Sequence, residues 1–288
     1  MRSILLLLLM TGFLATTKAQ RQRLKFEGQN REYIVYVPQQ NNNTNKNLPV
    51  VLNFHGSGMT HVEHMFYTNM NTTADKYQFI VVYPLGINKD WNVGFEMSYQ
   101  KGTNDVGFVK ELITVLKSKY KIDEKAIYAT GLSRGGFFCQ RIAAEMGDVF
   151  AAVASVGAPL PDSVKYYNQS KHKISVMQIH GTADEVVKYD GKDKGYASAL
   201  NTLNYWKEKN NITANTSEKT VKYDAKNTDI TFMEAKNKDA AVKLLSIKNG
   251  GHTWPGASPF NIGLPLGYTH QKLDANQAIW EFFSEHRK

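Results

Sequence analysis

The chain has 288 residues, a formal net charge of +9 and one cysteine. A single cysteine excludes an intrachain disulfide framework, and a chain of this length can bury a sufficient hydrophobic core without one. Its lysines and acidic residues interleave along the sequence instead of forming a basic block with interspersed aromatics. The composition therefore argues against a nucleic-acid partner.

Residues 1–19 have the pattern of a secretory signal peptide. Arg2 supplies the basic start, residues 4–14 are mostly apolar, and Ala19 ends a small-residue cleavage site. The apolar run is shorter than the roughly 20 residues that a transmembrane helix needs, and no later stretch qualifies. We therefore expect a protein that is secreted or periplasmic, has no membrane partner once the signal is removed, and forms a single domain of residues 20–288.

Strand-like and helix-like segments alternate along the remaining chain. An antiparallel hairpin is expected at 24–37, turning near residues 28–30. Buried strands are expected at 49–54, 79–83, 126–130, 150–156 and 174–179, two or three strands at 219–247, and helices after Asn104 or Asp105, after 135, at 197–209 and at 274–286. This alternation predicts an α/β fold with a mostly parallel central sheet.

Residues 131–135 read Gly-Leu-Ser-Arg-Gly, a G-x-S-x-G nucleophile elbow between an apolar strand and a helical pattern. In such an elbow the serine stands on a sharp strand-to-helix turn with its hydroxyl exposed. The glycines are needed because backbone segments there approach too closely for a Cβ atom. Ser133 is therefore predicted to be a nucleophile.

A candidate acid and a candidate base follow in the order Ser, Asp, His, which is the chain order of α/β-hydrolases. Asp184 follows a buried strand, where it would accept the N–H of a histidine and hold its tautomer. Two glycines precede His252, as expected for a turn that delivers the ring to Ser133. The alternative acids are Glu185, Asp190 and Asp193, and the alternative histidines are His55, His61, His64, His172, His180 and His270.

Residues 55–58 read His-Gly-Ser-Gly and follow the first central strand, where an oxyanion loop is expected. The backbone N–H groups of Ser57 and Arg134 are the predicted oxyanion donors. Trp91 and Trp254 lie near these loops in the sequence. We expect them to stack on an aromatic acyl group or a sugar ring, with packing in the core or at the rim as the alternative.

The sequence predicts no metal and no cofactor. His61 and His64 are spaced like metal ligands but lack a clear third ligand. Cys139 lies in the predicted helix after Ser133, between Phe138 and Ile142. We interpret it as a buried structural thiol.

The chain resembles the secreted esterase family that groups polyhydroxybutyrate depolymerase-like proteins with feruloyl and acetylxylan esterases. The resemblance rests on His55-Gly56 and on residues 91–94, 105–108, 131–136, 180–184, 251–256 and 278–283. It implies an α/β-hydrolase fold, with helices on both faces of the sheet, and a Ser133–His252–Asp184 triad. Many relatives carry Cys in place of Ser57, and Asn or Ala in place of Arg134. The Arg134 guanidinium would either steer an acidic substrate or face solvent.

Together these features predict a serine carboxylesterase that works through an acyl-enzyme. The substrates that we expect are feruloyl or acetyl esters of plant cell-wall polysaccharide. A polyhydroxyalkanoate depolymerase is the alternative enzyme. A non-catalytic, hydrolase-like binding protein is the alternative from another class, and the presence of all three triad residues argues against it.

Overall fold

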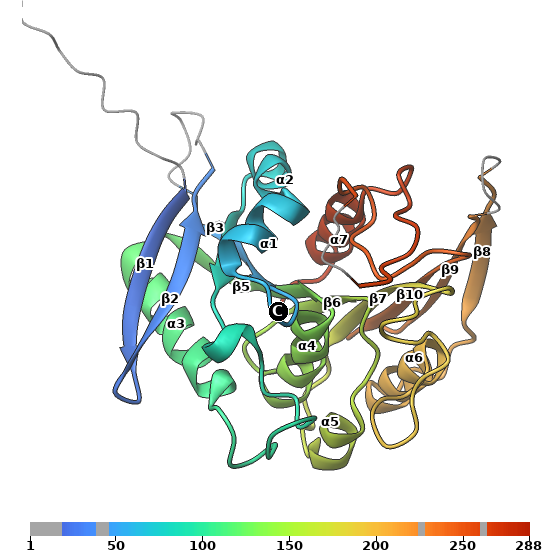
Figure 1. The fold of residues 1–288 in the computed structure, drawn as a ribbon, viewed down its shortest axis with the longest axis horizontal. Helices are drawn as coiled ribbons and strands as arrows, with labels where there is room; N and C mark the ends of the chain where they lie inside the picture. Colours follow the sequence, from blue (N-terminus) through green and yellow to red (C-terminus); the bar gives the residue numbers. More distant parts are fainter. Residues whose placement is uncertain (1–18, 39–45, 224–227, 260–263) are drawn as a thin grey trace, which may run out of the picture.

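The computed structural model describes residues 19–38, 46–223, 228–259 and 264–288. Within these ranges ten strands form one sheet, with helices on both of its faces (Figure 1). The predicted signal peptide lies outside the described residues except for Ala19, at which the first strand begins. None of the helices described is long and apolar enough to cross a membrane.

The strands and helices follow one another in the order expected for an α/β fold. The strands are β1 (Ala19–Phe26), β2 (Gln29–Tyr36), β3 (Leu48–Phe54), β4 (Ile80–Pro84), β5 (Ile122–Leu132), β6 (Ala152–Val156), β7 (Ser175–Gly181), β8 (Ser217–Val221), β9 (Ile230–Lys236) and β10 (Ala241–Ile247). The helices are α1 (His61–Thr68), α2 (Met70–Tyr77), α3 (Asp105–Lys119), α4 (Arg134–Glu145), α5 (Asp162–Tyr167), α6 (Ala199–Lys209) and α7 (Ala275–Ser284), with a short 3-10 turn at Ile87–Lys89.

The sheet has the strand order β1-β2-β4-β3-β5-β6-β7-β10-β9-β8. Pairing is parallel from β4 through β10, and antiparallel pairs flank this core on both sides. The predicted mostly parallel sheet is confirmed. In such sheets the loops after the carboxyl ends of the strands form the ligand site.

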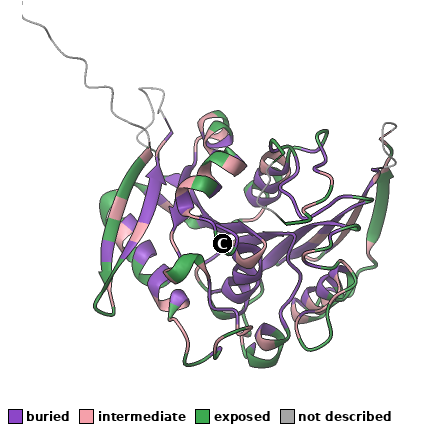
Figure 2. Ribbon diagram, in the orientation of Figure 1, coloured by how far each residue is buried: buried purple, intermediate pink, exposed green. Residues whose placement is uncertain are grey.

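Alternating side chains of the central strands point into two separate cores. Leu52 of β3 packs with Phe108 of α3 and Phe138 of α4 on one face. Its neighbour Val51 packs with Met70 of α2 and Phe283 of α7 on the other. Figure 1 shows the same division, with α3 to α6 on one side and α1, α2 and α7 opposite, and Figure 2 shows the buried strands between them. This two-sided burial explains why the central strands are continuously apolar.

Three helices were not expected from the sequence: α1, α2 and α5. For α1 the signal was present, because Thr60 and Glu63 form a capping box in which each side chain bonds the other residue's backbone N–H. The hairpin turn lies at Glu27 and Gly28, one residue before the predicted position. The segment at 219–247 supplies three strands, the larger of the two numbers expected.

Candidate active site

Ser133 stands at the junction of β5 and α4 with backbone angles of φ 55° and ψ −121°. A non-glycine residue with positive φ is strained and persists only where its surroundings hold it. Here the Ser133 N–H donates to Val156 O at 2.9 Å, and the Ser133 carbonyl accepts the Phe137 N–H at 2.8 Å. The strand-to-helix turn predicted for this serine is therefore present.

The glycines that flank Ser133 lie against the neighbouring strand. A Cβ atom on Gly135 would be 2.1 Å from Phe54 O, and one on Gly131 would be 2.7 Å from the same oxygen. Real Cβ atoms do not approach backbone atoms so closely. The close backbone approach predicted for these glycines is thus what the structure shows.

His252 and Asp184 are paired at the carboxyl-end edge of the sheet. His252 Nδ1 lies 2.7 Å from Asp184 Oδ2, and both side chains are buried. Because a carboxylate accepts, Nδ1 carries the proton and the other ring nitrogen, Nε2, is left to act as a base. The three alternative acids, Glu185, Asp190 and Asp193, are all exposed.

Four hydrogen-bond donors surround the Asp184 carboxylate. Oδ1 accepts the backbone N–H groups of Val186 and Val187 at 2.9 and 2.8 Å. Oδ2 accepts from His252, and His180 Nε2 lies 3.3 Å from it. Burial by itself would raise the pKa of Asp184, but the hydrogen bonds from His180 and His252 outweigh it and lower the pKa to about 2. The carboxylate is therefore charged at neutral pH.

The loop that carries His252 is fixed by close backbone packing. The backbone N–H of His252 donates to Leu266 O at 2.6 Å, and the Gly251 N–H donates to Tyr268 O at 2.9 Å. A Cβ atom on Gly251 would lie 2.0 Å from Leu266 O. At the turn expected before His252, the glycine therefore allows a close contact with a neighbouring segment.

The oxyanion loop is held by the buried ring of His55. The Gly86 N–H donates to His55 Nε2 at 3.0 Å, so Nδ1 carries the proton and donates to Gly56 O at 2.8 Å. The C=O and N–H of a trans peptide point in opposite directions. Anchoring the Gly56 carbonyl to His55 therefore directs the Ser57 N–H away from that ring.

Ser133, His252, Ser57 and Arg134 line one cavity of about 240 Å³. Its remaining wall is mainly apolar. It is formed by side chains from α1, α4, the end of β5 and three loops: Met59, Tyr67, Leu132, Phe137, Val186, Val187, Leu264 and Leu266. The backbone N–H groups of Ser57 and Arg134 donate to none of the residues described. The geometry thus places the predicted nucleophile, base and oxyanion donors around one apolar space.

The Arg134 guanidinium neither faces solvent nor is free to steer an acidic substrate, the two alternatives expected from the sequence. Its guanidinium pairs with Asp90 at 3.1 Å and with Glu96 at 2.7 Å, and lies over the Phe95 ring. Only 12% of the side chain is exposed. Two carboxylates therefore neutralise this charge, and it is not available to attract an acidic substrate.

The expectation that Trp91 and Trp254 stack on substrate is wrong. Their exposed fractions are 0% and 1%, and neither lines the cavity. The Trp91 ring stacks on Phe138, and its indole N–H donates to His55 O at 3.0 Å. The Trp254 indole N–H donates to Asn276 at 3.1 Å. Both tryptophans therefore pack in the core beside the active-site loops, which was the alternative to stacking on the substrate.

The remaining candidate side chains lie outside this cavity. Cys139 is buried, and burial raises the pKa of its thiol well above the usual range. His64 donates through Nε2 to Asn53, and His270 donates through Nε2 to Thr228 O. Among the described residues, His252 is the only histidine that lines the cavity, and no cluster of three metal-ligand side chains is found.

Sequence reasoning missed several residues of this site. His180 was weighed only as a base, although it follows the pattern of His55: each comes at the end of a parallel strand and precedes a glycine. Phe137 also lines the cavity, and its position four residues after Ser133 on the same helical face is the signal that could have found it. Tyr67, Leu264 and Leu266 come from segments distant in the chain, and no local sequence pattern predicts that they line the cavity.

Comparisons with known proteins identify relatives of this chain. Residues 31–197 match the family described as "Esterase PHB depolymerase". The bifunctional acetylxylan esterase/xylanase of Neocallimastix patriciarum is 30% identical over 163 residues, which are 57% of this chain and 23% of that enzyme. NocK of Nocardia uniformis, named as an esterase, is 27% identical over 257 residues, or 81% of this chain and 73% of that protein. Feruloyl esterase B of Piromyces equi is 27% identical over 179 residues, or 59% and 32%.

Solved structures show the same fold. The acetyl xylan esterase from Aspergillus awamori superposes with a TM-score of 0.63 at 17% identity, covering 92% of this chain and 99% of that one. A thermostable esterase gives a TM-score of 0.64 at 17% identity, covering 94% and 64%. The fold is therefore that of the α/β-hydrolase esterases.

Proposed function

The chain belongs to the esterase family of the PHB depolymerase type, and from that premise we propose that it is a serine carboxylesterase that removes acetyl or similarly small acyl groups from a plant cell-wall polysaccharide. One observation carries the proposal. Ser133, on its strained elbow, and His252, paired to a buried carboxylate, line the same cavity. A nucleophile, a base and an orienting acid are the parts that acyl transfer needs.

In the proposed reaction His252 Nε2 takes the proton of Ser133 as its Oγ attacks the ester carbonyl. The oxyanion that forms accepts hydrogen bonds from the Ser57 and Arg134 N–H groups. When the intermediate collapses, the C–O bond to the alcohol breaks and His252 returns the proton to the leaving oxygen. Water, activated by the same ring, then cleaves the acyl-enzyme and releases the acid. No cofactor takes part.

The size of the cavity favours a small acyl group. Its volume of about 240 Å³ is below the range of about 300–1,000 Å³ typical of sites that enclose drug-sized ligands. The feruloyl alternative depended on ring stacking by Trp91 and Trp254, which are buried. The choice of a polysaccharide as the substrate is based on the relatives. Two of them are named as an acetylxylan esterase/xylanase and a feruloyl esterase. We also propose that residues 1–19 direct export, on the sequence pattern given above.

A substrate panel tests the proposal. Purified protein is assayed on 4-nitrophenyl acetate, acetylated xylan, methyl ferulate and hydroxybutyrate oligomers, beside Ser133→Ala. Loss of a triad nucleophile costs about 10⁶ in turnover, so the variant is expected to be inactive. Asp184→Asn should lose about 10⁴, and Glu185→Gln serves as its exposed control. Activity of Ser133→Ala within tenfold of wild type would refute the mechanism, and hydrolysis of hydroxybutyrate oligomers alone would favour the depolymerase.

A further inference from the structure

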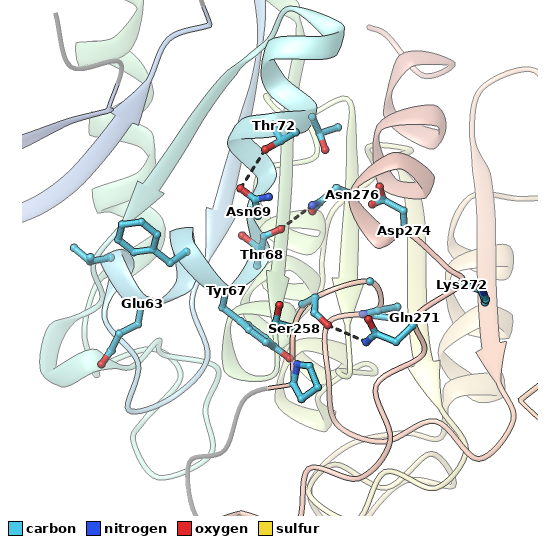
Figure 3. Close-up of a pocket in the computed structure, with 17 residues that line it drawn as sticks. Glu63, Tyr67, Thr68, Asn69, Thr72, Ser258, Gln271, Lys272, Asp274 and Asn276 are labelled. Atoms are coloured by element: carbon cyan, nitrogen blue, oxygen red, sulfur yellow. Dashed lines mark hydrogen bonds between the residues drawn. The ribbon is translucent and has the colours of Figure 1, made fainter. Parts of the chain in front are cut away.

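A second, larger cavity of about 780 Å³ opens beside the catalytic one. Helices α1 and α2 form one wall, and the segments at 255–259 and 271–276 form the other (Figure 3). Tyr67 lines both cavities. Its hydroxyl accepts the N–H of Trp254, two residues after His252, at 3.1 Å. This second cavity, called the groove below, therefore adjoins the catalytic cavity at Tyr67.

We propose that this groove binds a neutral polysaccharide chain, on the alcohol side of the ester that the catalytic cavity cleaves. The inference rests on the proposed function and names the part of the substrate that the catalytic cavity is too small to hold. A sugar chain lying along α1 and α2 would present an acyl group past Tyr67 to Ser133.

Hydrogen bonds join the two walls of the groove. Asn276 donates through Nδ2 to Thr68 O at 2.7 Å and accepts the Trp254 indole N–H through Oδ1 at 3.1 Å. The first bond joins the end of α1 to the start of α7 (Figure 3). The second joins the start of α7 to the loop that carries His252. A preformed groove loses little conformational entropy on binding, which favours affinity.

The lining offers oxygen acceptors that no described residue satisfies. Asp274 uses only Oδ1 in capping α7, and Glu63 uses only Oε2 in capping α1. Gln271 donates through its amide nitrogen to two carbonyls, and its oxygen accepts nothing from the described part of the chain. Sugar hydroxyls are donors that suit these oxygens. A hydroxyalkanoate polyester has only acceptors along its chain, so this lining favours the polysaccharide.

An exposed aromatic ring completes the groove. Phe66 of α1 is 74% exposed and lines this cavity. Phe66 therefore offers an apolar face beside the polar groups of the lining, a combination found in ligand sites. A sugar ring presents C–H groups on its faces and hydroxyls around its rim, so it can lie on Phe66 while its hydroxyls reach the acceptors.

The test compares two substrates that share the acetyl group. We expect Phe66→Ala to lower the ratio of kcat/KM on acetylated xylan to kcat/KM on 4-nitrophenyl acetate about threefold to tenfold, the range that one lost ring contact gives. Thr72→Trp, which fills the groove from an exposed position on α2, should lower the ratio at least as much. Tyr166→Ala is the matched control, because Tyr166 is 76% exposed and lines neither cavity. Its ratio should stay within twofold of wild type.

Binding without turnover separates this inference from the proposed function. Xylohexaose is titrated into Ser133→Ala and into Ser133→Ala with Thr72→Trp, followed by calorimetry. Saturable binding that Thr72→Trp weakens at least tenfold supports the groove even if no ester is cleaved. An unchanged substrate ratio in both groove variants, equal binding by both proteins, or an effect confined to hydroxybutyrate oligomers would overturn the proposal.

Discussion

The ring of His180 lies against the carboxylate of Asp184, with His180 Nε2 3.3 Å from Asp184 Oδ2. The same nitrogen is 2.8 Å from Val187 O, so it carries the proton and donates to both oxygens. Gln178 hydrogen-bonds to the other ring nitrogen at 3.0 Å. His180 therefore holds the carboxylate on which His252 depends, and we interpret it as a positioning residue.

His180→Leu should lower kcat on 4-nitrophenyl acetate about tenfold to a hundredfold, with KM close to wild type. The reason is that a small displacement of a catalytic group is costly in rate. His180→Gln keeps an N–H near the same oxygens and should recover most of kcat. The kinetic constants of both variants are measured beside their melting temperatures. Wild-type kcat in His180→Leu would show that His180 only fills space.

Acid should destabilise the protein through His55 well before its carboxylates protonate. Burial lowers the pKa of His55 to about 4, although the hydrogen bond to Gly56 opposes the shift. In the unfolded chain a histidine titrates near pH 6.5. The unfolded state therefore binds the proton first, and up to about 3 kcal/mol of stability, present above pH 6.5, is lost as the pH falls to 4.

Urea unfolding between pH 8 and pH 4 measures this loss. His55→Asn is the control variant, because Asn can donate to Gly56 O and does not titrate. Its free energy of unfolding should fall less over this range than that of wild type. A parallel fall in both proteins would mean that other groups cause the acid sensitivity. Asp184, with its pKa lowered to about 2, should add a further loss only as the pH falls from about 3.8 towards 2.

Gly135→Ala should destabilise the protein strongly, because the new Cβ would meet Phe54 O at 2.1 Å. Forcing extra atoms into a packed interior costs about 1–3 kcal/mol, and more where backbone must move. Gly195→Ala is the matched control, since its Cβ would lie 3.5 Å from the nearest atom, Lys192 O. Urea midpoints compare the two variants. Equal stability of both would contradict the close contact at the elbow.

Trp91→Ala should lower stability by about 3–5 kcal/mol, the usual cost of removing a large buried side chain. Because Trp91 supports His55 from beneath, activity on methyl ferulate and on 4-nitrophenyl acetate should fall by the same factor. A loss confined to the ferulate would restore Trp91 as a substrate-binding residue. The measurement is kcat/KM on both esters, with the unfolding free energy determined in parallel.

Local patterns predicted the elements well wherever one pattern governs a segment. The β5–α4 elbow and the strands β3 to β7 follow from apolar runs and from glycines that a close approach requires. Helices α1 and α2 are short and mixed in composition, and only the Thr60–Glu63 capping box marked the first of them. Burial of an aromatic side chain cannot be predicted in this way, and the tryptophans were therefore misassigned.

The sequence by itself determined the α/β class, the order of Ser133, Asp184 and His252, and the elbow, because each depends on residues close in the chain. Only the tertiary structure decided which groups share a cavity. Residues 67, 137, 187 and 266 meet at Ser133 because a parallel sheet brings the carboxyl ends of distant strands to one edge. It also decided that Arg134 is neutralised and that His180 holds Asp184, since such contacts depend on distance in space and not on spacing in the chain.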